Sequence, residues 1–209
     1  MENQMENQNA NPLNKKEINV LCLHGCNQTQ KMFTDLMKPM INLATTYCKD
    51  KEYTISWYFI EANYDHSFGG KTWYNVELDV SKIGQINMDH NMTDQTLDEL
   101  DLTIKNLKID VLLGFSQGGN VVDTYLVNKE NSIKCAVIFS GYNLIDPNRK
   151  KVNLPVLNVC SDADEIVKPK FMPLYKNMTV MKHEKGHKLP TSKPFVRQII
   201  EFVCKNGIQ

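Results

Sequence analysis

The sequence contains almost no arginine and no excess of charge of either sign. Only Arg149 and Arg197 are arginines among its 24 basic residues, and 24 acidic residues bring the formal net charge to zero. Nucleic-acid binding requires a basic excess that releases counterions from phosphates. Bidentate clamping of a phosphate or carboxylate relies on arginine. We therefore expect no nucleic-acid partner, and the composition argues against an anion clamp.

Long apolar runs and paired cysteines are also missing. No stretch of about 18 apolar residues occurs, as a membrane span would need, and the polar first residues lack the apolar centre of a signal peptide. The six cysteines form no C-x-x-C pair. Three of them lie in apolar runs that resemble strands, which favours buried free thiols. We expect a soluble, cytoplasmic protein without a membrane span.

The chain is long enough for one domain with a core of its own. A globular chain of 209 residues buries most of the surface of its unfolded form, so it needs no metal or disulfide to stabilise it. Residues 1–16 contain a tandem MENQ and are almost wholly polar. They predict a disordered leader, because too little apolar surface is present to offset the entropy lost on ordering. Residues 17–209 are expected to form a single domain.

From Ile18 onward, short β-rich runs alternate with segments of helical periodicity. This alternation is typical of a mostly parallel central sheet with helices on both faces, and continuous apolar runs indicate strands buried on both sides. The sequence therefore predicts an α/β fold. The expected strands are Ile18–Leu23, Thr54–Phe59, Asp110–Gly114, Cys135–Ser140, Val156–Cys160 and Thr179–Met181.

The intervening segments predict helices, with one exception. The first helical period contains Pro39, which implies a kink or a late start. A second, over residues 97–107, has Thr93 or Asp94 available as its N-cap. The exception is the segment 63–91, which is long, aromatic and glycine-containing. Such a loop inside a compact domain is usually functional, so we expect a lid or a pocket wall.

An apolar strand runs directly into the tract GFSQGG at residues 114–119. A Gly-x-Ser-x-Gly pattern at a strand-to-helix junction is typical of a nucleophile elbow, where the serine occupies a strained turn between two small residues. Ser116 is therefore the predicted nucleophile, with Gly114 and Gly118 in the small positions. A tight turn with an incidental serine is the alternative.

A serine nucleophile needs a base and an acid that orients the base, and after such an elbow they follow in the order serine, acid, histidine. The loop that begins at residue 161 carries three carboxylates. We favour Asp164 as the acid, with Asp162 as the alternative. His187, at a loop tip before the last helix, is the predicted base, and His183 is the alternative.

The oxyanion hole is expected to use two backbone amides. One belongs to Gln117, which follows the nucleophile, and the other to Cys26 in the loop after the first strand, where Gly25 allows the backbone to turn a donor inward. The thiol of Cys26 is then a bystander. A nucleophilic Cys26 is the alternative, although it lacks a local signature. We expect the ring of His24 to brace this loop.

Residues 183–187 (HEKGH) also match H-E-x-x-H, the zinc motif of metalloproteases. That chemistry requires both imidazoles on one face of a continuous helix. β-favouring residues precede the tract, Gly186 interrupts it and Pro190 ends it. We therefore expect no helix and no metal site here.

These tracts make the chain resemble the FSH family of serine hydrolases, a group of the α/β-hydrolase superfamily that includes an ovarian-tumour-associated esterase and a thioesterase releasing a fungal polyketide. The resemblance covers about residues 17–205 and implies a triad of Ser116, Asp164 and His187. The chain departs from the family at Tyr74, where a second tryptophan is common, and at Lys185, where a glycine is usual. The matching tracts are LCLHG at 21–25 with Gln28, GGKTWY at 69–74, GFSQGG at 114–119, FSGY at 139–142, DEIV at 164–167 and GH at 186–187.

The resemblance implies a serine hydrolase of the α/β-hydrolase fold that cleaves carboxylic esters or thioesters through an acyl-enzyme. The substrate would be a small molecule, with an aliphatic acyl part, and no cofactor is needed. The ordered length leaves no room for a separate cap domain. An acyl-protein thioesterase or carboxylesterase, and a non-catalytic scaffold, are alternatives.

A substrate pocket is predicted from aromatic residues, most of which lie in the segment 63–91. Packing of these rings onto the sheet edge is the alternative. The sequence does not determine the oligomeric state. The candidate pocket residues are Tyr64, Phe68, Trp73, Tyr74 and Tyr142.

Overall fold

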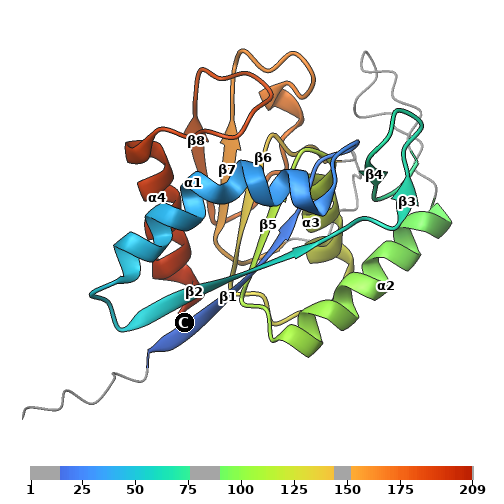
Figure 1. Ribbon diagram of the computed structural model, residues 1–209. Coiled ribbons are helices and arrows are strands. Elements are labelled where there is room, and N and C mark those ends of the chain that lie inside the picture. Colours follow the sequence, from blue (N-terminus) through green and yellow to red (C-terminus); the bar gives the residue numbers. More distant parts are fainter. Residues whose placement is uncertain (1–14, 76–89, 144–151, 209) are drawn as a thin grey trace, which may run out of the picture.

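A computed structural model of the chain describes residues 15–75, 90–143 and 152–208. One parallel sheet contains β1 (Lys16–Leu23), β2 (Tyr53–Ile60), β5 (Val111–Phe115), β6 (Cys135–Phe139), β7 (Val156–Cys160) and β8 (Met178–Lys182). The other elements are α1 (Gln30–Cys48), α2 (His90–Leu107), α3 (Gln117–Asn128), α4 (Lys193–Gly207), the hairpin of β3 (Tyr64–Asp65) and β4 (Lys71–Thr72), and the 3-10 helix η2 (Pro169–Phe171). The predicted parallel α/β architecture is confirmed (Figure 1).

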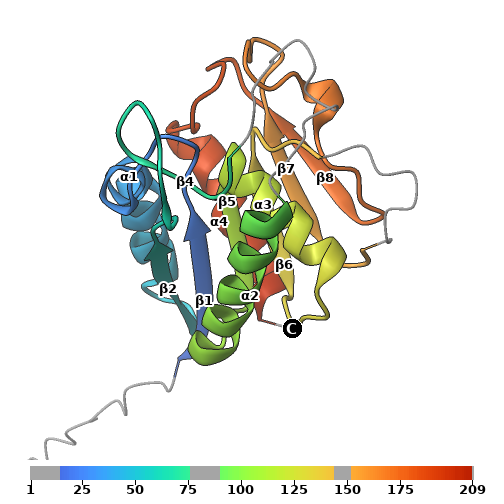
Figure 2. The same ribbon diagram turned by 90° about the vertical axis from the view of Figure 1, so that its right-hand side faces the viewer.

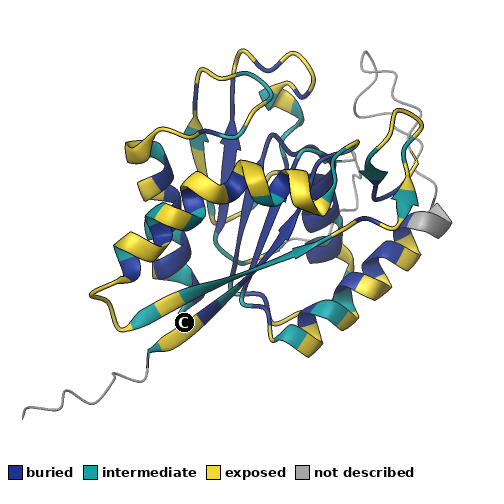
Figure 3. Ribbon diagram, viewed as in Figure 1, coloured by how far each residue is buried: buried dark blue, intermediate teal, exposed yellow. Residues whose placement is uncertain are grey.

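Side chains alternate along β1 between two hydrophobic cores. Ile18, Val20 and Cys22 belong to the core that includes residues of α1 and α4, whereas Leu21 and Leu23 belong to the core that includes residues of α2 and α3. Figure 2 shows these helix pairs on opposite faces of the sheet. The inner strands are buried on both faces (Figure 3), which explains their continuous apolar sequences.

Two expectations about helix ends are wrong. Thr29 caps α1 by accepting a hydrogen bond from Met32 N at 3.2 Å, and the helix continues through Pro39. The late start is therefore wrong, and the kink at Pro39 stays a prediction. Thr93 and Asp94 lie inside α2, which begins at His90, so neither is its N-cap. The first apolar residues of the pattern predict a later start for α2, but the helix extends beyond them toward its N-terminus.

The ends of the predicted leader and loop also shift. Lys15 Nζ donates to Cys48 O at 3.1 Å, and β1 begins at Lys16, so the leader is shorter than the predicted 1–16. Residues 1–14, and residues 76–89 of the predicted lid, lie outside the described residues, so the disorder, the lid and the absence of a cap domain stay predictions. Nowhere in the described parts of the chain is a helix long and apolar enough to cross a bilayer.

The sheet order β2-β1-β5-β6-β7-β8 places a topological switch between β1 and β5. From β1 the chain adds β2 on one side, then returns to place β5 on the other side and continues outward to β8. In parallel sheets, ligands bind beyond the carboxyl ends of the strands at such a switch. The loop after β1 carries Cys26 and the turn after β5 carries Ser116, so both predicted features meet there.

Candidate active site

Ser116 occupies the turn between β5 and α3. Its backbone has φ 53° and ψ −117°, a region that residues other than glycine rarely adopt. Ser116 N donates to Phe139 O on β6 at 2.9 Å, and Ser116 O accepts from Asn120 N on α3 at 3.0 Å. The neighbouring strand and the following helix therefore hold the strained turn, as a nucleophile elbow requires.

Gly114 and Gly118 allow this turn to pack closely. A Cβ atom at Gly114 would lie 2.4 Å from Gly118 O, and one at Gly118 would lie 2.4 Å from Leu23 O. Both distances are much shorter than a van der Waals contact between a carbon and a backbone oxygen, so neither position has room for a side chain. The close packing that we predicted for these two positions is therefore confirmed.

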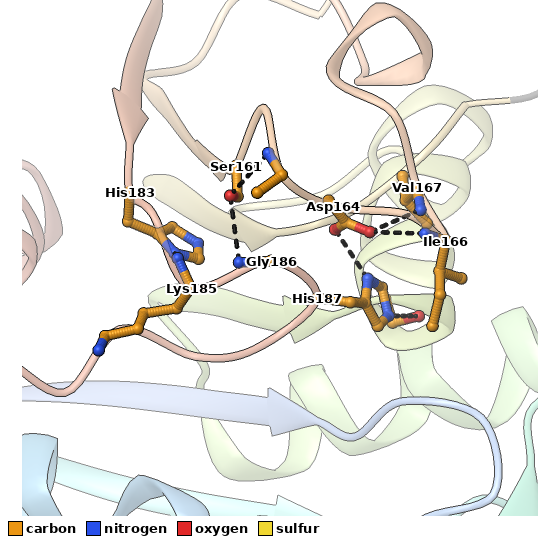
Figure 4. Close-up of polar contacts among 10 residues, drawn as sticks. Ser161, Asp164, Ile166, Val167, His183, Lys185, Gly186 and His187 are labelled. Carbon is orange, nitrogen blue, oxygen red and sulfur yellow. Dashed lines mark hydrogen bonds and ion pairs between the residues drawn. The ribbon is translucent and has the colours of Figure 1, made fainter.

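Three predicted residues from separate loops form one chain of hydrogen bonds. His187 Nε2 lies 3.0 Å from Ser116 Oγ. On the other side of the ring, His187 Nδ1 lies 2.8 Å from Asp164 Oδ2 (Figure 4). Because an ionised carboxylate can only accept, Nδ1 carries the proton and Nε2 can accept from the serine hydroxyl. This is the geometry by which a base activates a serine.

Asp164 is fully buried, and its second oxygen is also occupied. Oδ1 accepts hydrogen bonds from Ile166 N at 2.9 Å and from Val167 N at 2.8 Å. Burial raises the pKa of the Asp164 carboxyl, but the hydrogen bonds from Val167 and His187 outweigh it, so that pKa lies below its ordinary value. The carboxylate is therefore ionised at neutral pH, and its orientation is held from both sides.

The alternative acid and base point elsewhere. Both carboxylate oxygens of the exposed Asp162 lie 2.9 Å from Lys182 Nζ, in a surface ion pair. The ring of His183 accepts a hydrogen bond from Lys185 N at 3.1 Å within its own loop, and burial lowers its pKa. Asp164 and His187, the residues that we favoured, are the pair in contact with each other.

The zinc alternative fails on geometry. Residues 183–187 form a loop of bends, so the two histidines do not share a helix face. His187 already uses both ring nitrogens toward Ser116 and Asp164. In the described part of the chain, no three His, Cys, Asp or Glu side chains are grouped to hold a metal ion.

The loop after β1 is fixed directly after Cys26. Asn27 N donates to Lys71 O at 2.8 Å, and Lys71 N donates to Gln28 O at 2.9 Å, which pairs the loop with β4. Among the described residues, no group accepts a hydrogen bond from the amide of Cys26 or from that of Gln117. Their role as oxyanion donors stays a prediction.

The thiol of Cys26 does not have the properties of a nucleophile. Cys26 Sγ lies 3.8 Å from Thr72 Oγ1, and burial raises the pKa of the thiol above its ordinary value. Because the thiolate is the reactive form, the protonated group is inert at neutral pH.

His24 braces the same loop, as predicted. The ring is fully buried, its Nδ1 lies 2.7 Å from Gly25 O, and its Nε2 accepts from Ala62 N at 3.1 Å. Burial lowers the pKa of the imidazole, so the ring is neutral with Nδ1 as donor. It thereby ties the loop after β1 to the chain just beyond β2.

The side chain of Gln117 takes part in a clamp that the sequence did not indicate. Its Oε1 accepts from Thr72 Oγ1 and from Trp73 N, each at 3.0 Å, and its Nε2 donates to Tyr74 O at 2.8 Å. These bonds hold residues 72–74 against the first turn of α3. No local motif could have revealed them, because the partners lie 43–45 residues apart.

Three of the predicted pocket residues, Trp73, Tyr74 and Tyr142, are buried. Trp73 is 4% exposed and Tyr74 is 1% exposed. Trp73 Nε1 donates to His24 O at 2.8 Å, and Tyr74 OH hydrogen-bonds Asn120 and lies 3.1 Å from the hydroxyl of the buried Tyr142. These contacts fit the alternative of packing onto the sheet, and a role in substrate binding stays a prediction.

The other two aromatics lie on the hairpin. Tyr64 OH donates to Gln95 Oε1 of α2 at 2.9 Å, and Phe68, near the tip, is 85% exposed. A cavity of about 390 Å³ adjoins Trp73 between β2 and α2, but Ser116 is not among its lining residues. Neither Tyr64 nor Phe68 lines that cavity, and their role in substrate binding stays a prediction.

Comparison with known proteins identifies the family. A family model described as serine hydrolase (FSH1) matches residues 13–199. The chain is 31% identical over 122 residues to "Family of serine hydrolases 3" of Saccharomyces cerevisiae. That alignment covers 48% of this chain and 46% of the yeast protein, so the chain spans about half the length of this relative.

Solved structures share the fold at low sequence identity. Arabidopsis thaliana SOBER1 gives a TM-score of 0.69 at 14% identity, over 91% of this chain and 99% of SOBER1. A carboxylesterase from Mesorhizobium loti gives 0.68 at 13% identity, over 90% and 88% of the two chains. The Bacillus cereus carboxylesterase gives 0.64 at 21% identity, over 91% and 89%.

These likenesses confirm the predicted α/β-hydrolase fold. The family match covers the loop after β1, the elbow at Ser116 and the loops that carry Asp164 and His187. It confirms the resemblance inferred from those tracts. The chain therefore belongs to the serine hydrolase (FSH1) family.

Proposed function

We propose that the protein hydrolyses carboxylic esters or thioesters through a Ser116-His187-Asp164 triad. The observation that carries the proposal is the continuous hydrogen-bonded chain, 3.0 Å from Ser116 Oγ to His187 Nε2 and 2.8 Å from His187 Nδ1 to Asp164 Oδ2. Family membership supports the same reaction class.

In the acylation step, Ser116 Oγ attacks the carbonyl carbon while His187 Nε2 takes the hydroxyl proton. The carbonyl oxygen becomes an oxyanion that accepts hydrogen bonds from Cys26 N and Gln117 N. His187 then gives its proton to the departing alcohol or thiol, which leaves an acyl group on Ser116. Asp164 remains ionised throughout and stabilises the imidazolium.

In the deacylation step, water takes the place of the alcohol or thiol. His187 removes a proton from the water as it attacks the acyl carbon, and the same two amides bind the second oxyanion. The proton returns to Ser116 Oγ when the acyl-oxygen bond breaks. The products are a carboxylic acid and the free enzyme.

The substrate class follows from the family resemblance. We expect a small ester or thioester with an aliphatic acyl part. The zero net charge of the chain argues against electrostatic steering of the substrate. A series of p-nitrophenyl esters of increasing acyl length, with matched acyl thioesters, would define the preferred acyl group by kcat/KM.

Labelling with a fluorophosphonate probe tests the proposal. The wild-type protein is expected to react at Ser116, and Ser116→Ala is expected to lose both labelling and p-nitrophenyl ester turnover. Cys26→Ala is the control, and it should label as the wild type does because only its backbone amide is used. An adduct on Cys26, or turnover retained by Ser116→Ala, would contradict the mechanism. A folded wild-type protein that does not label would favour the non-catalytic scaffold.

We also place the protein in the cytoplasm, a reducing compartment. All six cysteines are free, and five of them are buried. Free thiols in this number are typical of proteins from reducing compartments.

A further inference from the structure

Ser161 joins the loops that carry the acid and the base. We define the acid loop as residues 161–167, directly after β7, and the histidine loop as residues 183–188, directly after β8. The residue is 0% exposed. A serine hydroxyl in such a place needs hydrogen-bond partners, because an unpaired buried polar group is costly.

Within the acid loop, Ser161 shapes the turn that presents Asp164. Ser161 O accepts a hydrogen bond from Asp164 N at 3.1 Å, and Ser161 Oγ accepts one from Ala163 N at 3.2 Å. Serine side chains commonly stabilise turns by binding the amide two residues on. Two hydrogen bonds to Ser161, one to its backbone and one to its side chain, therefore fix the backbone that carries Asp164.

The same oxygen reaches the histidine loop. Gly186 N donates to Ser161 Oγ at 3.2 Å, across 25 residues of sequence (Figure 4). Gly186 has φ 64°, and a Cβ atom there would lie 3.2 Å from Ala163 O, so the two loops are in close contact at this point. His187 is the next residue, so any movement of Gly186 moves the base.

The two loops are therefore attached at two points. One is the bond between Asp164 and His187, at 2.8 Å, and the other is the bond between Ser161 and Gly186. The histidine loop is also held at its start, where His183 N donates to Cys160 O at 3.0 Å. The bond from Gly186 is the attachment next to His187, whose Nε2 lies 3.0 Å from Ser116 Oγ.

We propose that Ser161 is a positioning residue, which acts through Asp164 and His187 without touching the substrate. The inference rests on the proposed function, because it concerns the alignment of that triad. Displacement of a reacting group by about 1 Å can lower a rate 100-fold. Loss of the Ser161 hydroxyl should therefore reduce kcat rather than substrate binding.

The test compares Ser161→Ala with Ser161→Thr, which retains a hydroxyl. For p-nitrophenyl butyrate, we expect Ser161→Ala to lower kcat by about 10- to 100-fold with KM changed less than about twofold. Ser161→Thr should recover most of kcat. The matched control is Ser192→Ala, an exposed serine with no side-chain cap bond, which should behave as the wild type. Unchanged kcat in Ser161→Ala, or an equal loss in both Ser161 variants, would overturn the inference.

Two further measurements need no substrate. In the unaltered protein the Gly186 amide should exchange slowly with solvent hydrogen, and rapid exchange would overturn the inference even if Ser161→Ala did not fold. The downfield NMR signal of the His187 Nδ1 proton should shift or broaden in Ser161→Ala and remain in Ser161→Thr. If the wild type turned over no ester while these two results held, the proposed function would fail and the positioning role of Ser161 would stand.

Discussion

Gln117 Oε1 lies 3.0 Å from the backbone nitrogen of Trp73, a residue 44 positions earlier in the chain. The backbone amide of Gln117 is a proposed oxyanion donor, so one residue serves the site with its main chain and holds the hairpin segment with its side chain. Lys71, two residues before Trp73, pairs with the loop that carries Cys26. The two proposed oxyanion donors are therefore connected to each other through β4.

Replacing Gln117 should destabilise the fold. Gln117→Ala leaves the buried Trp73 N without its acceptor and removes one of the two hydrogen bonds to Tyr74 O, which Thr72 Oγ1 also donates to. We expect the free energy of unfolding to fall by about 1–3 kcal/mol. Urea denaturation followed by tryptophan fluorescence measures this change. Gln198→Ala, on the exposed face of α4, is the matched control and should change stability by less than about 0.5 kcal/mol. Equal stability of the two variants would show that the clamp contributes nothing.

Substitution of Asp164 and of Asp162 by asparagine should have very different effects on kcat. Asp164→Asn should lower kcat by about 10³- to 10⁴-fold, because an amide cannot hold the imidazole in the required tautomer. Asp162→Asn breaks only an exposed ion pair with Lys182 and should leave kcat unchanged, with a stability cost of about 0–1 kcal/mol. Steady-state kinetics with a p-nitrophenyl ester distinguish them. A larger loss in Asp162→Asn than in Asp164→Asn would reverse the assignment of the acid.

Gly118 should tolerate no side chain. In Gly118→Ala the new Cβ would meet Leu23 O at 2.4 Å and His24 O at 2.5 Å, and we expect a loss of about 3 kcal/mol or more because backbone atoms must move. Gly69→Ala is the control, since Gly69 has φ 88° but open space around its Cα. Its cost should be the conformational one of about 1–2 kcal/mol. Thermal unfolding of both variants measures the difference, and similar melting temperatures would contradict the role of close packing.

Stability should fall as the pH drops below the ordinary histidine pKa of 6.5. Burial lowers the pKa of His24 in the folded state, so between its lowered pKa and 6.5 the unfolded chain binds a proton that the folded chain does not. Stability is therefore full above pH 6.5 and declines below it. Burial lowers the pKa of His183 as well, and that residue acts in the same direction.

Urea denaturation at pH 8 and at pH 5.5 tests this expectation. The decrease in the free energy of unfolding from pH 8 to pH 5.5 should be smaller in His24→Gln than in the wild type. The decrease that remains should come from His183 and other titrating groups. If His24→Gln retained the whole decrease, the buried His24 ring would not be its source.

Local patterns were sufficient for the strands of the parallel sheet and for the elbow, but they did not indicate the short hairpin of β3 and β4, which lies in the expected loop 63–91. The inner strands were found because burial on both faces leaves a continuous apolar run in the sequence itself. The elbow was found because Gly114, Ser116 and Gly118 meet their packing requirement within five residues, next to an apolar strand. The helix ends at Thr29 and His90 were missed, because helices extend past the apolar stripe that marks them.

The sequence by itself therefore determined the parallel α/β sheet, the tight serine turn between β5 and α3, and the two loops in which an acid and a base are proposed. The sequence favoured Asp164 over Asp162 and His187 over His183, but only the tertiary structure shows that Asp164 and His187 contact each other. Only it revealed the contacts of the Gln117 and Ser161 side chains. The physical reason is distance along the chain. Contacts across 23 to 71 residues depend on how neighbouring strands align and where each loop leaves the sheet, and no local spacing encodes that alignment.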